Sequence, residues 1–240
     1  MAEPPGAQPP DARPPLVAVA HGSRDPAAAA ATRALLAEVR RQRPGLEVLE
    51  SYLDHASPRL AEVLAGLDHA VVVPLLLGAA YHSRVDVPAA IRATGGRAVQ
   101  ADVLGPDPLL LDALERRLAE AGAPAGDPST AVVLAAAGSS DASAVEGVRE
   151  LAAAWRQRGW WAVVPAYASA ASPTVADAVA DLRRRGAPRV VVATYLLFPG
   201  VFADAMATAG ADLVSAPLAD APEVAELVLT RYDDAVSGGG

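Results

Sequence analysis

The 240-residue sequence contains no cysteine, no lysine and no asparagine. Without cysteine the chain can form no disulfide bond, and any metal site must draw its ligands from histidine, aspartate and glutamate. Without lysine, local basic groups other than histidine are arginines, whose planar fork of donors suits carboxylates. The net charge of −8 argues against nucleic acid as a partner, because a phosphate backbone is bound through clustered basic side chains.

Long apolar runs are also missing. No segment approaches the roughly 20 apolar residues that a membrane-spanning helix requires, so we expect no membrane partner. The N-terminal residues MAEPPGAQPPDARPP lack the basic start and apolar run of a secretory signal. These absences predict a cytoplasmic protein. Hydrophobic residues make up 52% of the chain and charged residues 20%, which is typical of a folded protein.

An internal duplication organises the chain. VVLAAAGSSD (132–141) matches VAVAHGSRD (17–25), and AYASAASP (166–173) matches SYLDHASP (51–58). VVVATYLLFPGVF (190–202) matches VVVPLLLGAAYH (71–82), and PLADAPEVAELV echoes VLGPDPLLLDAL later in each copy. Matches in the same order indicate two repeats of about domain size. The first repeat carries His21 and His82 where the second carries Ala137 and Phe202.

The repeats and the Pro-, Gly- and Ser-rich stretches between them predict the domain organisation. We expect a disordered tail at 1–15, a first lobe at 16–121, a linker at 122–129, a second lobe at 130–236 and a frayed tail at 237–240.

Each repeat alternates short β-branched runs with helical patterns. In the first, apolar runs predict strands at 16–20, 46–53, 70–77 and 97–104. Helical spacing predicts helices at 26–43, 57–67 and 106–121, and a loop followed by a helix at 79–94. Right-handed crossovers would then give an α/β fold of two similar Rossmann-like lobes, each a four-stranded parallel sheet flanked by helices. With a strand order of 2-1-3-4, the order reverses between strands one and three, where open α/β sheets bind ligands.

Two histidines arrive at that point of reversal. His21 directly follows the first strand, and His82 follows the third strand after a loop of small residues. Two neutral imidazoles suit a first-row divalent ion such as Fe²⁺ or Co²⁺. A site with two protein ligands is open and suited to passing a metal on. Either imidazole, with an ordinary pKa near 6.5, can also accept a proton.

Polar residues near these histidines are candidates for binding a substrate. Ser23, Arg24, Tyr81 and Arg84 could bind carboxylates, and each arginine is equally consistent with a solvated surface group. Asp86 could orient an imidazole through a hydrogen bond, or could be a charge at a helix N-terminus.

The remaining histidines and the tryptophans are expected to have other roles. His55 ends the second strand and is expected to lie displaced outward at the same sheet edge, which disfavours it as a ligand. His69 precedes the third strand at the opposite edge and is interpreted as structural. Trp155, Trp160 and Trp161 are expected to pack in a core or interface.

The motifs AHGSRD, VVVPLLL, GAAYHSRVDVP and VLGPDPLLLDAL resemble the sirohydrochlorin chelatases of the CbiX and SirB group, and the resemblance extends over about 16–235. It implies a class II chelatase fold with a cleft between two lobes, in which His21 and His82 bind the metal and perform catalysis. The implied substrate is sirohydrochlorin, with Fe²⁺ giving sirohaem or Co²⁺ leading toward cobalamin. The metal would be a substrate, and no tightly bound cofactor is expected. One site for two fused repeats is compatible with a working monomer.

Other functions remain to be compared with this one. A non-catalytic carrier of a tetrapyrrole or of a metal would use the same two histidines. A dinucleotide-binding oxidoreductase is disfavoured because HGSRDP lacks the spacing G-x-G-x-x-G. A serine hydrolase is disfavoured because no G-x-S-x-G motif follows a strand. Iron, cobalt and nickel all accept imidazole, so the metal stays open.

Overall fold

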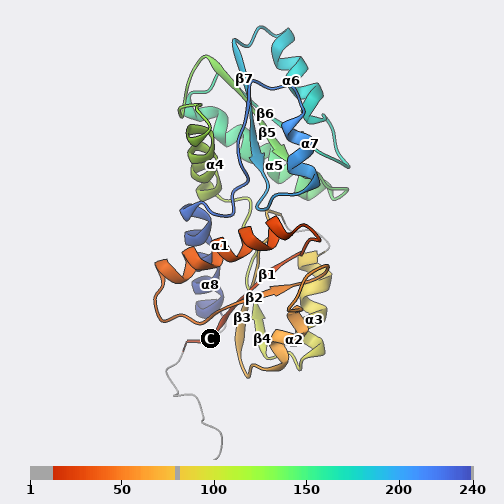
Figure 1. Ribbon diagram of the computed structural model, residues 1–240, viewed down its shortest axis with the longest axis vertical. Coiled ribbons are helices and arrows are strands. Elements are labelled where there is room, and N and C mark those ends of the chain that lie inside the picture. Colours follow the sequence, from red (N-terminus) through yellow and green to blue (C-terminus); the bar gives the residue numbers. More distant parts are fainter. Residues whose placement is uncertain (1–12, 79–81, 239–240) are drawn as a thin grey trace, which may run out of the picture.

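The computed structural model describes residues 13–78 and 82–238, which form two α/β lobes stacked along the long axis of the molecule (Figure 1). Each lobe contains a four-stranded parallel sheet, with strand orders β2-β1-β3-β4 and β6-β5-β7-β8. The predicted fold class and strand order are therefore confirmed. Among the described residues, no helix has the length and apolar character needed to cross a membrane.

The strands of the first repeat are β1 (Leu16–Ala20), β2 (Val48–Tyr52), β3 (Ala70–Pro74) and β4 (Ala98–Gln100). Its helices are α1 (Pro26–Gln42), α2 (Leu60–Ala65), α3 (Val87–Ala93) and α4 (Pro108–Glu120), and a π-helical turn (His82–Asp86) precedes α3. The strands of the second repeat are β5 (Thr130–Ala136), β6 (Ala162–Tyr167), β7 (Arg189–Tyr195) and β8 (Leu213–Val214). Its helices are α5 (Ala142–Trp155), α6 (Val175–Arg184), α7 (Val201–Ala207) and α8 (Pro222–Gly238), with a 3-10 turn (Arg156–Arg158) after α5.

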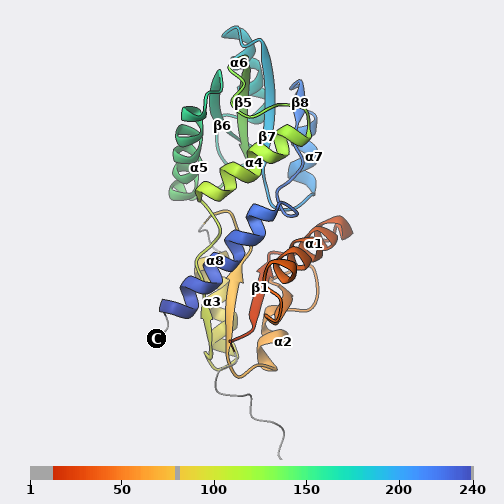
Figure 2. The ribbon, with the colours of Figure 1, turned by 90° about the vertical axis from the view of Figure 1, so that its left-hand side faces the viewer.

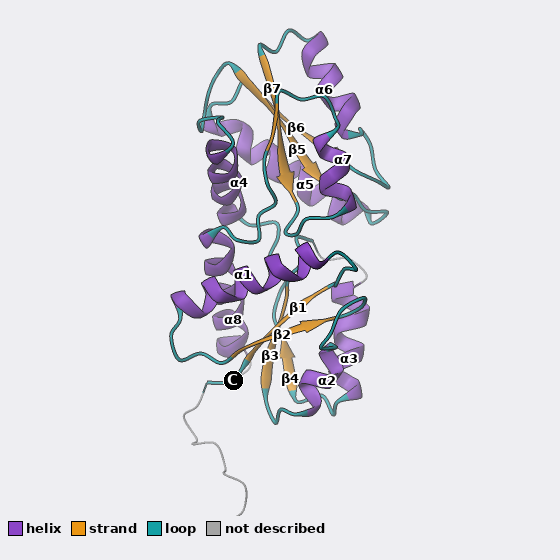
Figure 3. Cartoon of the chain, viewed as in Figure 1, coloured by secondary structure: helices purple, strands orange, loops and turns teal. Residues whose placement is uncertain are grey.

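Helices cover both faces of each sheet (Figure 3). In the first lobe, α2 and α3 pack on one face and α1 and α8 on the other. The central strands β1 and β3 are buried along their whole length, as their continuous apolar sequences require. At the start of α1, the Asp25 carboxylate accepts a hydrogen bond of 2.9 Å from the Ala27 amide. This cap and Pro26 in the first turn fix where the helix begins.

The two repeats exchange their last helices. Helix α4 of the first repeat packs against β7 and α5, whereas α8 of the second repeat packs against α1 and β3 (Figure 2). The ranges predicted for the lobes, 16–121 and 130–236, therefore each include a helix that lies on the other sheet. The predicted linker at 122–129 joins α4 to β5 without helix or strand.

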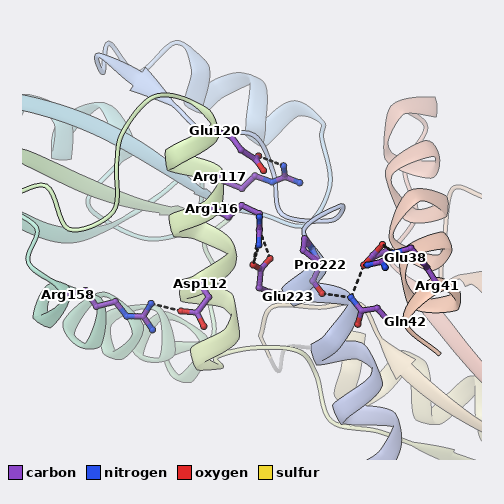
Figure 4. Close-up of polar contacts among 10 residues, drawn as sticks. All are labelled: Glu38, Arg41, Gln42, Asp112, Arg116, Arg117, Glu120, Arg158, Pro222 and Glu223. Carbon is purple, nitrogen blue, oxygen red and sulfur yellow. Dashed lines mark hydrogen bonds and ion pairs between the residues drawn. The ribbon is translucent and has the colours of Figure 1, made fainter.

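Polar contacts join α4 and α8 to each other and to neighbouring elements where the two lobes meet (Figure 4). Arg116 of α4 donates to Glu223 of α8 at 2.6 and 2.8 Å, and Gln42 of α1 donates to the Pro222 carbonyl at 2.9 Å. Arg231 of α8 donates to Asp107 at 2.8 Å. The largest hydrophobic core runs through both lobes along these helices, which joins them over an extended surface.

The helix after β2 starts later than the sequence predicts. Ser57–Pro58 was expected to begin it, but α2 begins at Leu60. The Tyr52 amide donates to the Pro58 carbonyl at 3.0 Å, and Arg59 is extended, so this segment continues alongside the end of β2. Residues 75–77, expected to extend β3, lie beyond its end at Pro74, although the Leu75 amide still donates to the Val19 carbonyl at 2.8 Å.

The tryptophans pack as predicted. Trp155 is fully buried, and its ring meets that of Trp160 edge-on, with 6.0 Å between centroids. Its indole N–H donates to Glu115 of α4 at 2.9 Å, which satisfies the buried donor. Trp161 lies under the Arg185 guanidinium, 5.6 Å from the ring centroid.

Candidate active site

A cavity of about 510 Å³ lies between the two lobes. The carboxyl ends of β1, β3, β5 and β7 border it, so both points of strand-order reversal face the same space. This volume falls within the range of small-molecule sites, about 300–1,000 Å³. The lining residues lie in 20–23 and 75–78 of the first repeat and in 136–139 and 195–203 of the second, with others from α1, β2, α5 and β6.

The second repeat lines the cavity with apolar side chains. Phe198 and Leu197 come from the segment after β7, and Val201 and Phe202 from the first turn of α7. Val201 is 81% exposed and Phe202 is 44% exposed, although both are large hydrophobic residues. Exposed apolar side chains beside a cavity are available to a ligand with an apolar face.

His21 stands at the edge of this cavity, in the turn directly after β1. The next residue, Gly22, has φ of +93°, and a Cβ there would lie 1.7 Å from the Asp54 carbonyl oxygen. Only glycine allows this approach, which brings the loop after β2 onto the His21 turn. The Asp54 amide donates to the His21 carbonyl at 2.8 Å and holds the loop there.

The loop after β2 places His55 beside His21. The two imidazole rings meet edge-on with 6.0 Å between centroids, and His55 has φ of 58°. The expectation that His55 is displaced outward is therefore wrong, because the chain folds back over Gly22. The sequence signal that points to this proximity is the position of DHASP directly after the second strand, at the same sheet edge as His21.

Asp54 is fixed between His55 and Arg59. Its Oδ1 accepts hydrogen bonds from the His55 amide at 2.8 Å and from the Arg59 guanidinium at 2.9 Å. Its Oδ2 lies 3.5 Å from Nε2 of His55. The hydrogen bond from Arg59 is the main cause that lowers the pKa of Asp54, so the carboxylate beside His55 stays ionised at neutral pH.

Whether His21 and His82 face one ion stays a prediction. His82 opens the π-helical turn before α3, but its side chain and all of Tyr81 lie outside the described residues. Among the described residues, no group of three histidine, aspartate or glutamate side chains is arranged to hold a metal ion. His69 is exposed at the opposite edge of the sheet, as the sequence predicts.

The backbone on both sides of residues 79–81 is held by side chains from other elements. Tyr195 of the second lobe donates from its hydroxyl to the Leu77 carbonyl at 3.3 Å. Burial raises the pKa of Tyr195, so this hydroxyl keeps its proton. Gln100 of β4 donates to the Ser83 carbonyl at 2.8 Å. Side chains from both lobes therefore hold the backbone that comes before and after His82.

The candidate substrate-binding residues differ in where they lie. Ser23 lines the cavity, and its Oγ accepts from the Asp25 amide at 3.0 Å. Arg24 is exposed and is not among the described residues that line the cavity. Asp86 closes the π-helical turn before α3, and its side chain makes no capping hydrogen bond to that helix, so both alternatives for its role stay predictions.

Arg84 reaches across to the second lobe. Its guanidinium donates to Asp141 Oδ2 at 3.2 Å and lies 3.5 Å from Ser143 Oγ. Asp141 is the N-cap of α5, and its hydrogen bonds with Ser143 lower the pKa of its carboxyl group. The first lobe's arginine therefore faces a carboxylate that is ionised at neutral pH.

Known proteins resemble the chain over both repeats. A sirohydrochlorin ferrochelatase from Priestia megaterium is 30% identical over 161 residues, which cover 62% of this chain and 60% of that protein. A sirohydrochlorin cobaltochelatase from the same organism is 26% identical over 197 residues, covering 76% of this chain and 64% of that protein. Both matches span less than two thirds of the relative's length.

A solved structure has the same architecture. SirB from Bacillus subtilis with Fe³⁺ aligns with a TM-score of 0.81 at 22% identity, covering 95% of this chain and 97% of that chain. At this identity the likeness shows the fold. The model of the CbiX family matches residues 15–121 and 131–235, which include both repeats. The chain therefore belongs to the CbiX family.

Proposed function

We propose that this protein is a sirohydrochlorin chelatase, a lyase that inserts a divalent metal ion into the tetrapyrrole in the cleft between its lobes. The observation that carries the proposal is His21 at the edge of a cavity of about 510 Å³ that both repeats line. The names of the two curated relatives, a ferrochelatase and a cobaltochelatase acting on sirohydrochlorin, support the same reaction.

The walls of the cavity suit a flat macrocycle. Leu75 and Leu77 line it from the first repeat, and Phe198 and Phe202 from the second. Apolar side chains on two lobes can cover the faces of a tetrapyrrole ring while its carboxylates stay at the solvent-exposed edge. Burial of the ring faces would then supply much of the binding free energy, at roughly 25 cal/mol per Å².

Metal insertion exchanges one divalent ion for two protons. As the ion bonds to the pyrrole nitrogens, two pyrrole N–H protons must leave. We assign His21 and His82 to both tasks: each imidazole can bind the incoming ion and can then accept a proton near neutral pH. Two ligands from the protein leave the remaining coordination positions open to the macrocycle, so the ion can be transferred.

Arginines at the cleft are proposed to bind the substrate carboxylates. Arg84 would exchange its contact with Asp141 for a bidentate pair with a carboxylate, and Arg24 and Ser23 would bind at the other side of the His21 turn. The net charge of −8 repels a polyanionic ring, but this repulsion is screened beyond about 8 Å at physiological salt. Replacing Arg24 and Arg84 together with alanine should weaken substrate binding, and unchanged affinity would remove this assignment.

The test of the function is anaerobic incubation with sirohydrochlorin and Fe²⁺ or Co²⁺, followed by visible absorbance. We expect His21→Ala and His82→Ala each to slow insertion by about 100-fold or more, because each removes a ligand and proton acceptor. His69→Ala is the matched control at the opposite edge of the sheet. Binding of the tetrapyrrole without insertion would instead identify a non-catalytic carrier.

The same assay compares the rates with iron, cobalt and nickel, between which the imidazole ligands do not select. We propose that the chain acts as a cytoplasmic monomer with no tightly bound cofactor, since one chain supplies both walls of the cavity. Cell fractionation and sedimentation at assay concentration test these two statements.

A further inference from the structure

We propose that His55 is a further metal ligand and that, with His21, it forms a loading site for the divalent ion at the rim of the cleft. The inference rests on the proposed function for the identity of this ion as a substrate. The site takes borderline divalent ions of the first transition row, which accept imidazole nitrogen.

The separation of the two rings fits a shared ion. A ligating imidazole nitrogen lies about 2.0–2.1 Å from zinc, so two rings on one ion have centroids roughly 5–6 Å apart. The rings of His21 and His55 are 6.0 Å apart and nearly perpendicular, at 86°. This separation falls within the range for two imidazoles that bind one ion.

The Asp54 carboxylate lies beside the His55 ring, where carboxylates often stand next to metal-binding histidines. Its Oδ2 lies 3.5 Å from Nε2 of His55, while Oδ1 is fixed by Arg59 at 2.9 Å. A carboxylate on one ring nitrogen sets the orientation of the imidazole and makes the other nitrogen a better ligand. The carboxylate of Asp54 would therefore make His55 a better ligand, and the hydrogen bond from Arg59 keeps this carboxylate in place.

The backbone does not require histidine at position 55. The matching residue of the second repeat is Ala170, which has φ of 56° where His55 has 58°. The left-handed conformation thus belongs to the loop in both repeats, with or without an imidazole. An imidazole at this position is an addition to the scaffold, beside the imidazole of His21, where the second repeat has Ala137.

The position of His55 suits loading of the ion. Its side chain is 40% exposed, and the residue lies outside the lining of the cavity, whereas His21 is part of that lining. An ion bound by both would lie at the rim without filling the space of the ring. From there it can pass to the cavity while His21 stays bound to it.

The experiment measures binding of Co²⁺ alone, without tetrapyrrole, by anaerobic isothermal titration calorimetry. We expect His55→Ala to weaken binding by about tenfold or more. Because Ala170 already has the same backbone conformation, this variant should fold, which circular dichroism checks. His69→Ala, an exposed histidine away from the cleft, should bind Co²⁺ as the wild type does.

The outcomes separate this inference from the proposed function. If His55→Ala binds Co²⁺ as tightly as the wild type while the wild type inserts metal into sirohydrochlorin, the inference is wrong and the function stands. If Co²⁺ binding depends on His55 but no insertion occurs, the metal site stands and the chelatase function is wrong. A folded His55→Ala with weakened Co²⁺ binding, in a chain that inserts metal, supports both.

Discussion

The two repeats share their backbone at the cleft but not their side chains. Gly22 and Gly138 have φ of +93° and +90°, and each is approached by a carbonyl of the loop after the next strand. His55 and Ala170 share a left-handed conformation. Because the same turns form with and without histidine, the fold does not need the imidazoles, which stand at these positions in the first repeat alone.

At the cleft, the second repeat has apolar surface where the first repeat has histidines. Phe202 occupies the position that matches His82, and it lines the cavity with 44% of its surface exposed. An apolar side chain stands where the other copy has a candidate ligand. Under the proposed function, one lobe would bind the ion and the other would cover the ring. The following variants test which features belong to the scaffold and which to the site.

The largest effect is expected from adding a methyl group to the shared turns. Gly22→Ala and Gly138→Ala should each lower the free energy of unfolding by about 2–5 kcal/mol, from the positive φ together with a backbone clash. The built Cβ would lie 1.7 Å from a carbonyl oxygen at Gly22 and 1.8 Å at Gly138. Urea denaturation measures both.

Gly45→Ala and Gly186→Ala are matched controls, because φ is +87° and +86° but no atom lies within 4 Å of the built Cβ. They should cost only about 1–2 kcal/mol. Equal losses at all four glycines would show that the close approach of the loops contributes nothing. A loss at Gly22 without one at Gly138 would show that the repeats are not equivalent at this turn.

Phe202→Ala tests whether the second lobe covers the ring. Contact of the exposed part of this ring with a macrocycle would contribute about 1 kcal/mol, so we expect tetrapyrrole affinity to fall about fivefold. Co²⁺ binding without tetrapyrrole should not change. Fluorescence quenching on titration with sirohydrochlorin measures the affinity. Val99→Ala is the control, since Val99 is similarly exposed at 45% but lies on β4, outside the cavity lining.

A second metal pair can be built in the second repeat. Ala137→His combined with Ala170→His places imidazoles at the positions that match His21 and His55. Because the backbone is the same, we expect Co²⁺ stoichiometry to double from one to two ions per chain. Ser169 stands where the first repeat has Asp54, so no carboxylate would orient the new imidazole and the new site should be the weaker one. A folded variant that still binds one ion would show that the pair of rings is insufficient.

Sequence pattern was enough for the sheets and for their duplication, because buried parallel strands have continuous apolar sequences that repeat in order. It was not enough for α4 and α8, since an amphipathic helix shows that one face is buried but not which sheet buries it. The contact between His21 and His55 was missed for a related reason. It depends on a carbonyl approaching Gly22, a tertiary contact that the motif HGSRD does not contain.

The smallest effect is expected at the contact between the lobes. Asp141→Asn keeps an oxygen that can accept the capping hydrogen bond from the Ser143 amide but removes the charge opposite Arg84. If Arg84 exchanges Asp141 for a substrate carboxylate, its release should tighten tetrapyrrole binding by about twofold, the scale of an exposed ion pair. Glu146→Gln removes an equal charge from the same helix, where Glu146 pairs with Arg149, and should have no such effect. Equal tightening by both variants would assign the change to net charge alone, whereas weaker binding by Asp141→Asn would mean that the ion pair holds the cleft in its binding shape.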